Sequence, residues 1–345
     1  MAERESSGLN EPLPWQGDLW ARVRAAADAG RMPHAYLIHG PAGLGKAHFA
    51  RMLAEGLLCR KADRGMACGN CDACTLLRAD SHPDLYWCEP AADGRPDRDK
   101  GSIGVDQVRD LCHFLSLTPH RQGGRRIVVI RDAHRMNINA ANALLKTLEE
   151  PMESGLLLLV TEHPSRLPAT VISRCQRLRC VPPASDSAVS WLAERCPEGA
   201  DPLLLLALTG GSPLAAAELA GKEGLARREA MLGELEDLAQ GRSDPVSIAA
   251  GWLKFGARES LYWLYHWLAD MLRLDAGSTP AHIAGAGCEE RLRRLARAIP
   301  ADELHRTLRQ TEKALRLVEG QSNAQLLLED VLIAWSAAAG RIAPR

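Results

Sequence analysis

Residues 35–46, AYLIHGPAGLGK, join a short apolar run to a glycine-rich loop that ends in a lysine. The apolar run at residues 35–39 predicts a buried strand. Residues 47–58 follow with apolar side chains at helical spacing. A strand, a glycine-rich loop and a helix in this order are the context of a phosphate-binding P-loop, in which the helix N-terminus and the lysine meet phosphate oxygens. The candidate nucleotide-binding residues are Gly40, Gly43, Gly45 and Lys46.

The same loop lacks parts that ATP hydrolysis needs. An ATPase places Ser or Thr after the lysine, where the hydroxyl binds Mg²⁺, but Ala47 has no oxygen to offer. A strand pattern at residues 126–130 is followed by Arg131 and Asp132, where an ATPase has Asp-Glu to hold Mg²⁺ and activate water. If these two are ordinary surface residues instead, hydrolysis is equally unsupported. We therefore expect little or no hydrolysis, while binding of ATP or ADP stays open, as does a chance match to the loop pattern.

Four closely spaced cysteines follow the predicted helix in the pattern C-x8-C-x2-C-x2-C: Cys59, Cys68, Cys71 and Cys74. A C-x2-C turn carries two sulfurs to one side of the backbone, and four thiolates complete the tetrahedral shell of a structural zinc ion. We therefore expect a structural Zn²⁺ site within residues 59–74. An iron–sulfur cluster, for which C-x2-C-x2-C is also typical, and reduced thiols without a ligand are the alternatives.

Length and composition limit the class of protein. The 345 residues suit two or three domains, and 46% hydrophobic with 25% charged residues is ordinary for a globular chain. The net charge of −1 argues against a protein that binds DNA mainly through its own surface. No apolar run approaches the roughly 20 residues of a membrane-spanning helix, and residues 1–10 are too polar for a signal peptide. We expect a cytoplasmic protein with reduced cysteines.

Further motifs carry a family resemblance. Residues 139–150 (NAANALLKTLEE) predict a helix ended by a proline, and residues 156–161 (LLLLVT) predict another buried strand. With GPAGLGK, the four cysteines, IGVDQVRDL at 103–111 and SRC at 173–175, they resemble the clamp-loader branch of the AAA+ ATPases. NALLKTLEEP together with SRC is highly specific for clamp loaders. The resemblance is strong over about residues 33–180 and weaker towards the C-terminus.

The resemblance implies a fold that combines an α/β part with an all-α part. It implies a RecA-like parallel-sheet domain with the zinc module over residues 1–180, a small helical lid over 181–222 and a helical collar for oligomerisation over 223–345. Helical patterns broken by Gly, Pro and Ser agree with the last two parts. These patterns cover residues 189–195, 202–209, 214–220, 225–239, 245–255, 258–274, 289–298, 301–319 and 324–339.

An aromatic cluster lies within the expected collar. Six aromatic side chains fall in residues 252–267. Aromatic rings can stack on nucleic-acid bases, but basic residues are sparse there. We therefore expect these rings to pack in a helical core or a collar interface.

The resemblance also implies a role for one arginine. The SRC arginine of this family acts in trans, which would place Arg174 in the ATP site of a neighbouring motor subunit. A guanidinium suits this role because its planar fork binds phosphate oxygens. Motors carry Thr or Ser after the loop lysine, Asp-Glu at the strand end and an arginine in the lid. In this chain Ala47, Arg131 and Leu214 take those positions, so we expect a non-motor subunit.

Implied partners follow from the same resemblance. They are the gamma/tau and delta subunits in a hetero-pentamer that loads the sliding clamp onto primed DNA, as part of the DNA polymerase III holoenzyme. Polymerase activity of the chain itself is not expected, because we find no paired metal-binding carboxylates suited to nucleotidyl transfer. The alternatives are an active motor ATPase of gamma/tau type and a zinc-containing, nucleotide-sensing adaptor outside replication.

Overall fold

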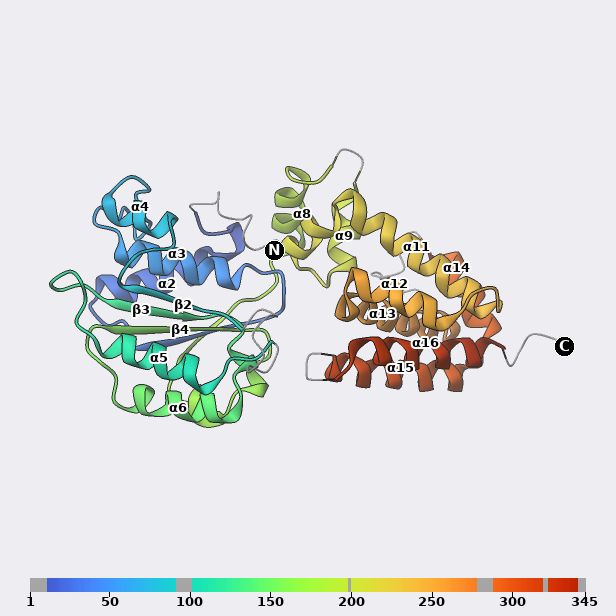
Figure 1. The fold of residues 1–345 in the computed structure, drawn as a ribbon. Helices are drawn as coiled ribbons and strands as arrows, with labels where there is room; N and C mark the ends of the chain where they lie inside the picture. Colours follow the sequence, from blue (N-terminus) through green and yellow to red (C-terminus); the bar gives the residue numbers. More distant parts are fainter. Residues whose placement is uncertain (1–10, 91–100, 198–199, 278–287, 319–321, 341–345) are drawn as a thin grey trace. The chain divides into compact units, whose positions relative to one another are not determined.

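The computed structural model describes residues 11–90, 101–197, 200–277, 288–318 and 322–340 (Figure 1). The chain divides into two compact units. One combines Met1–Trp191 with Ser212–Ala215, and the other combines Leu192–Gly211 with Ala216–Arg345. The first is called the sheet unit and the second the helical unit.

A five-stranded parallel sheet, in the order β2-β3-β4-β1-β5, forms the centre of the sheet unit. Its strands are β1 Ala35–His39, β2 Leu85–Cys88, β3 Arg126–Ile130, β4 Gly155–Thr161 and β5 Gln176–Arg179. The middle strand β4 is buried at every residue, as is typical of a strand covered on both faces of a parallel sheet. Ala35 of β1 pairs with Leu157 of β4, and His39 pairs with Thr161. The carboxyl ends of these two neighbouring strands therefore lie side by side.

Helices cover both faces of this sheet (Figure 1). One face packs against α2 Gly17–Asp28, α3 Lys46–Leu58 and α4 Asp72–Arg78. The other packs against α5 Val105–Ser116, α6 Ile138–Glu149 and α7 Ala169–Ile172. Successive strand residues point to opposite faces, so Ile38 joins the first core and Leu37 the second. The expected parallel α/β architecture, with helices on both faces of the sheet, is confirmed.

Two strands lack a clear sequence signal because they lie at the edges of the sheet. β5 has the sequence QRLR, in which only Leu178 is buried. β2 has one buried residue, Cys88, and three that are partly exposed. An edge strand is covered less than a central one, so its residues do not form the apolar run that predicts a buried strand.

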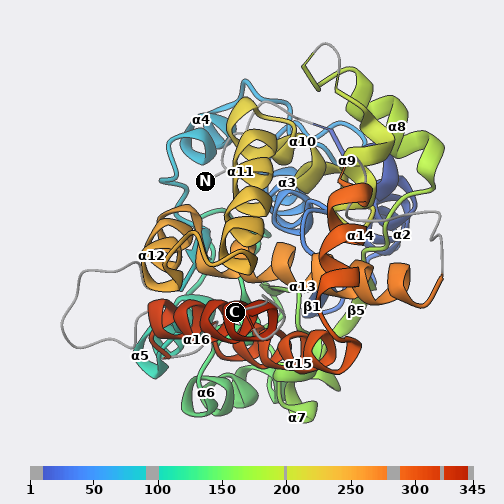
Figure 2. The same ribbon diagram turned by 90° about the vertical axis from the view of Figure 1, so that its right-hand side faces the viewer.

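The helical unit is a bundle of helices. Its members are α9 Pro202–Leu208, α11 Lys222–Ala239, α12 Pro245–Phe255, α13 Ala257–Asp275, α14 Glu289–Ala298, α15 Ala301–Leu317 and α16 Ala324–Gly340. Figure 2 shows α15 and α16 side by side. Two further helices, α8 Ser185–Ala193 and α10 Pro213–Leu219, contain residues of both units.

The predicted helices are confirmed with small shifts at their ends. The first begins at Ser185 rather than at residue 189, and the predicted end at residue 319 lies outside the described residues. No single helix in the described part of the chain is long and apolar enough to cross a membrane. The short helices α9 and α10 reach that length and composition only when they are taken together as a bent pair.

Tryptophans fill the core of the helical unit. Trp252, Trp267 and Trp335 are almost completely buried. The indole Nε1 of Trp252 donates to Oε2 of Glu234 at 2.7 Å, and that of Trp335 donates to the backbone oxygen of Leu235 at 3.0 Å. Buried indoles keep a hydrogen-bond partner in this way. The core position expected for the aromatic cluster is confirmed for Trp252 and Trp267.

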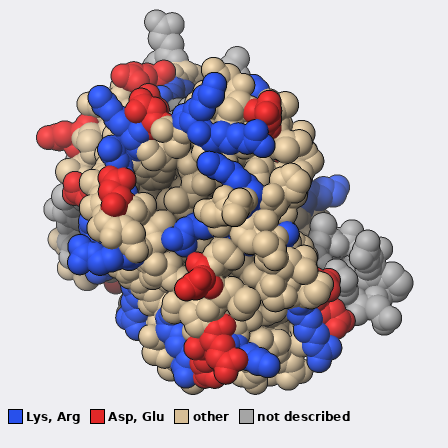
Figure 3. Space-filling model, turned by 90° about the vertical axis from the view of Figure 1, so that its left-hand side faces the viewer, with Lys and Arg blue, Asp and Glu red and all other residues tan. Residues whose placement is uncertain are grey.

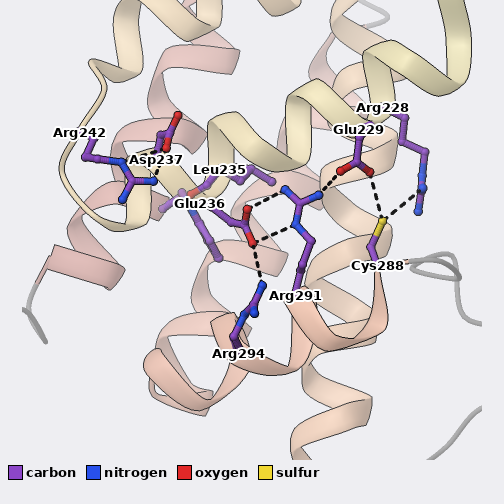
Figure 4. A network of polar contacts seen from close by, with 10 residues as sticks. Arg228, Glu229, Leu235, Glu236, Asp237, Arg242, Cys288, Arg291 and Arg294 are labelled. Atoms are coloured by element: carbon purple, nitrogen blue, oxygen red, sulfur yellow. Dashed lines mark hydrogen bonds and ion pairs between the residues drawn. The ribbon is translucent and has the colours of Figure 1, made fainter.

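An ion-pair network ties α14 to α11 (Figure 4). The guanidinium of Arg291 donates from Nη2 to Oε2 of Glu236 at 2.6 Å and from Nε to Oε1 at 3.0 Å. It also contacts Glu229. Arg294 lies 3.9 Å from Glu236, at the edge of the network. The two-point fork fixes the orientation of α14 more tightly than a single charge contact would.

Arg291→Ala is expected to destabilise the helical unit by about 1–2 kcal/mol, because Glu236 loses a bidentate, partly buried partner. Urea unfolding followed by tryptophan fluorescence measures this change, since the unit's core is rich in tryptophan. Arg297→Ala is the matched control, because Arg297 lies exposed on the same helix. Equal unfolding midpoints for the two variants would contradict a stabilising network.

Candidate functional site

The predicted nucleotide-binding residues lie together in the loop between β1 and α3. Gly40 follows β1 directly, and Lys46 is the first residue of α3. Gly40 has a φ of +152°, and a Cβ there would lie 2.2 Å from the backbone oxygen of Cys180. Only glycine fits this position. The loop lies at the carboxyl ends of parallel strands, which is where α/β folds bind ligands.

The remaining loop glycines pack against the chain's own side chains. Gly43 and Gly45 have φ values of +69° and +74°, and in a working P-loop such positions let the backbone approach phosphates. Here a Cβ at Gly45 would lie 2.4 Å from Cδ1 of Leu13. One at Gly43 would lie 2.8 Å from the Cβ of Ala215. Protein atoms therefore take up space beside both glycines.

Lys46 is held by groups of the same chain. Its side chain is 3% exposed, and Nζ donates a 2.6 Å hydrogen bond to the backbone oxygen of Pro41. Nζ also lies 3.6 Å from Oε1 of Glu162, which directly follows β4. A buried ammonium needs a counter-charge, and Glu162 provides one. The lysine that would meet a phosphate thus has an acceptor and an opposite charge within the protein.

A turn near the N-terminus closes over the loop. Pro14–Gln16 forms the short 3-10 helix η2, and Gln16 is fully buried. Its Nε2 donates to the backbone oxygens of Leu44 at 3.0 Å and Gly45 at 2.9 Å. Trp15 Nε1 donates to the same Leu44 oxygen at 3.1 Å. Sequence analysis missed this turn, because its partners lie 28 and 29 residues further on and PWQ matches no motif.

The three residues that depart from the ATPase pattern lie in α3, directly after β3 and in α10. Ala47 is buried in the first turn of α3. Arg131 lies at the end of β3, with Nη1 3.5 Å from Oε1 of Glu89. The backbone N–H of Leu214 donates to the backbone oxygen of Gly43 at 3.1 Å. These residues offer a methyl group, a guanidinium and an isobutyl group where the family resemblance implies a hydroxyl, a carboxylate and an arginine in an active ATPase.

The four predicted cysteines form a single cluster where the end of α3 meets the start of α4. Their Sγ atoms all lie within 4.8 Å of one another. The measured separations are 3.8 Å for Cys59–Cys71, 3.9 Å for Cys68–Cys74, 3.5 Å for Cys71–Cys74 and 3.6 Å for Cys59–Cys74. Tetrahedral zinc, with Zn–S bonds of ~2.3 Å, holds its sulfurs ~3.8 Å apart. The cluster could therefore hold a metal ion, and its size fits zinc.

Backbone N–H groups donate to these sulfurs and favour their thiolate form, while burial opposes it. The N–H groups of Lys61 and Cys68 donate to Sγ of Cys59 at 3.3 and 3.2 Å, although burial still raises the pKa of this thiol. Donation from the backbone of Cys74 lowers the pKa of Cys71 to about 6, whereas burial raises the pKa of Cys74 to about 12. Because the thiolate is the form that binds metals, N–H donation to sulfur favours metal binding.

Arg174 lies just after α7 and is anchored at two points. Its Nη2 donates to Oε1 of Glu149 at 2.7 Å, and its Nη1 donates to the backbone oxygen of Thr170 at 2.9 Å. Its side chain is 35% exposed. The contact joins SRC to the end of NALLKTLEEP, which the sequence alone did not predict. A partly exposed, oriented guanidinium can bind phosphate oxygens of another molecule.

Charges of both signs share the face of the molecule shown in Figure 3. Most of this face is uncharged, and basic and acidic side chains are scattered over it. Because a DNA backbone is bound through many positive contacts, the acidic side chains among the described residues of this face weigh against it as a DNA-binding surface.

Comparison with known proteins provides matches over almost the whole chain. A protein-family model described as "DNA polymerase III, delta subunit" matches residues 15–184, and one described as "DNA polymerase III, delta subunit, C terminal" matches residues 222–337. DNA polymerase III subunit delta' of Pseudomonas aeruginosa is 35% identical over 335 residues, which cover 95% of this chain and 98% of that protein. The chain belongs to the DNA polymerase III delta' family.

Two delta' relatives match far more of the chain than a related subunit does. The delta' subunit of Escherichia coli is 33% identical over 93% of this chain and 94% of that subunit. DNA polymerase III subunit tau of Escherichia coli is 39% identical, but over 42% of this chain and 21% of tau. These two delta' matches therefore extend through both units, whereas the tau match covers less than half of the chain. The family resemblance expected from the motifs is confirmed.

Proposed function

We propose that this delta' family chain is the non-motor subunit of a bacterial clamp loader, in a hetero-pentamer with gamma/tau and delta subunits. The complex loads the sliding clamp onto primed DNA. The observation that carries the non-motor role is the closed P-loop, in which Lys46 pairs with Glu162 and Leu13 packs on Gly45. Relatives matched over nearly their full length are delta' subunits, which supports the assignment to this complex.

Each part of the chain has a proposed task in that complex. Residues 1–180 act as a nucleotide-binding-like domain, residues 181–222 as a lid and residues 223–345 as an oligomerisation collar. Leu326 and Ile333 of α16 support a collar contact, because they are 60% and 49% exposed and lie seven residues apart on one helix. Exposed apolar side chains on one helical face are typical of a protein interface.

The metal of the four-cysteine cluster is proposed to be Zn²⁺ with a structural role. Cys59, Cys68, Cys71 and Cys74 supply all four ligands of a closed tetrahedral site, which keeps no position for a substrate or water. Bound zinc would cross-link the end of α3 to the start of α4, because Cys59 and Cys71 cap these helices.

Arg174 is proposed to act outside its own chain. It would reach the ATP site of a neighbouring motor subunit and stabilise the charge that develops on the transferred phosphoryl group. Its partial exposure and its two anchors support this role. A subunit without hydrolysis of its own would then contribute to hydrolysis by its neighbour.

Steady-state ATP hydrolysis by the purified chain with Mg²⁺ tests the non-motor role directly. We expect no turnover above background. Ala47→Thr should be equally inactive, because the restored hydroxyl leaves both Arg131 and the Lys46–Glu162 pair in place. Turnover equal to that of a gamma/tau-type subunit assayed in parallel would instead identify an active motor.

Clamp loading on primed DNA tests the assignment to the complex. Gamma/tau, delta and the sliding clamp are combined with and without this chain. We expect efficient loading only when the chain is present, and co-elution of the chain with the other subunits. Failure to co-elute would favour the adaptor outside replication.

A further inference from the structure

The contact between Glu149 and Arg174 joins the two motifs that are most specific in this sequence. Glu149 is the last residue of α6, within NALLKTLEEP, and Arg174 belongs to SRC. The 2.7 Å hydrogen bond from Nη2 to Oε1 is an ion pair between side chains that are 35% and 52% exposed. A pair that is this exposed contributes little to folding stability. Stability alone therefore does not account for the contact.

The geometry of the pair restricts the guanidinium plane. One nitrogen, Nη2, is bound to Glu149, and the other terminal nitrogen, Nη1, is bound to the backbone oxygen of Thr170. Both anchors stand on packed elements, because Leu148 of α6 and Val171 of α7 share one hydrophobic core. A guanidinium has five N–H donors in a fixed plane, so two anchors still leave donors for phosphate oxygens.

We propose that Glu149 is a positioning residue for Arg174. It holds the guanidinium in the orientation that meets the neighbouring ATP site, so that the long side chain does not have to be ordered during each turnover. The proposal rests on the proposed trans role of Arg174. A displacement of about 1 Å at a reacting group can cost ~10²-fold in rate, so the loss of this anchor should reduce hydrolysis at that site measurably.

The test uses the assembled complex of this chain with the motor and delta subunits. kcat and KM for MgATP are measured for complexes that carry Glu149→Ala, Glu149→Gln, Arg174→Ala or the Glu149→Ala/Arg174→Ala double substitution. Glu150→Ala is the matched control, since Glu150 is the adjacent exposed glutamate at the same helix end. Gel filtration establishes that each complex is intact.

We expect Glu149→Ala to lower kcat towards the value of the Arg174→Ala complex while KM stays unchanged, because the anchor acts in the transition state. Glu149→Gln keeps an acceptor oxygen and should recover part of the loss. The double substitution should equal Arg174→Ala, because a positioning residue has no effect once its target is gone. Glu150→Ala should match the wild type.

The possible contrary results separate the two proposals. If the Arg174→Ala complex is slow but the Glu149→Ala complex turns over ATP at the wild-type rate, the positioning role is overturned and the trans role stands. Wild-type turnover in both overturns the trans role and the positioning role together. A double substitution that is slower than Arg174→Ala shows that Glu149 acts through another group, which also overturns the positioning role.

Discussion

Removal of the metal from the four-cysteine cluster is expected to unfold residues 59–74 and to lower the thermal unfolding temperature of the sheet unit. A structural zinc site contributes on the order of 10 kcal/mol to the folding of small metal-bound segments. Residues 60–72 are at most partly buried, and Leu77 is the residue by which α4 joins the sheet core. Few buried apolar side chains would therefore hold residues 60–72 in place without the metal.

Zinc analysis and thermal unfolding with and without a chelator measure the effect. We expect one Zn²⁺ per chain and a clear loss of stability on chelation. Cys74→Ser should lose the metal, whereas Cys112→Ser should keep it, since Cys112 lies on α5 outside the cluster. Protons compete with the metal for the sulfurs, so the zinc-dependent stability should be present at neutral pH and be lost as the pH falls.

A chain purified without zinc, with the unfolding temperature of Cys74→Ser equal to that of the wild type, would contradict a structural zinc site. Iron with a visible absorption band would support the iron–sulfur alternative instead. These results differ in metal content as well as in stability, so the three possibilities are distinguishable.

Arg174→Ala is expected to slow ATP hydrolysis at the site it serves by on the order of 10³-fold, the lower end of the effect of an arginine finger. Other ATP sites in the complex keep hydrolysing ATP. The total turnover therefore falls by the fraction of ATP hydrolysis that this one site contributes. The effect is large because the guanidinium stabilises charge that exists only in the transition state. Steady-state turnover of the assembled complex, with and without the substitution, measures it.

Arg177→Ala is the control for this prediction, because Arg177 is an exposed arginine three residues away. Circular dichroism and gel filtration should show the same fold and the same assembly for both variants. Unchanged turnover in an intact Arg174→Ala complex would mean that Arg174 does not take part in hydrolysis.

Local patterns predicted most of the sheet unit. The strands at 126–130 and 156–161 are confirmed because a central parallel strand is covered on both faces and is therefore apolar along its length. The cysteine cluster was predictable because its short loops alone carry the sulfurs to one place. The edge strands β2 and β5 were not, since partial exposure removes the apolar run.

The sequence by itself determined the class of fold, the loop between β1 and α3, the four-cysteine cluster and the family. Only the tertiary structure decided what surrounds these features: Glu162 beside Lys46, Gln16 over the loop and Glu149 beside Arg174. Helical and strand periodicity reports burial within one element. These contacts instead join residues that are far apart in the chain, and they exist only after separate elements have packed together.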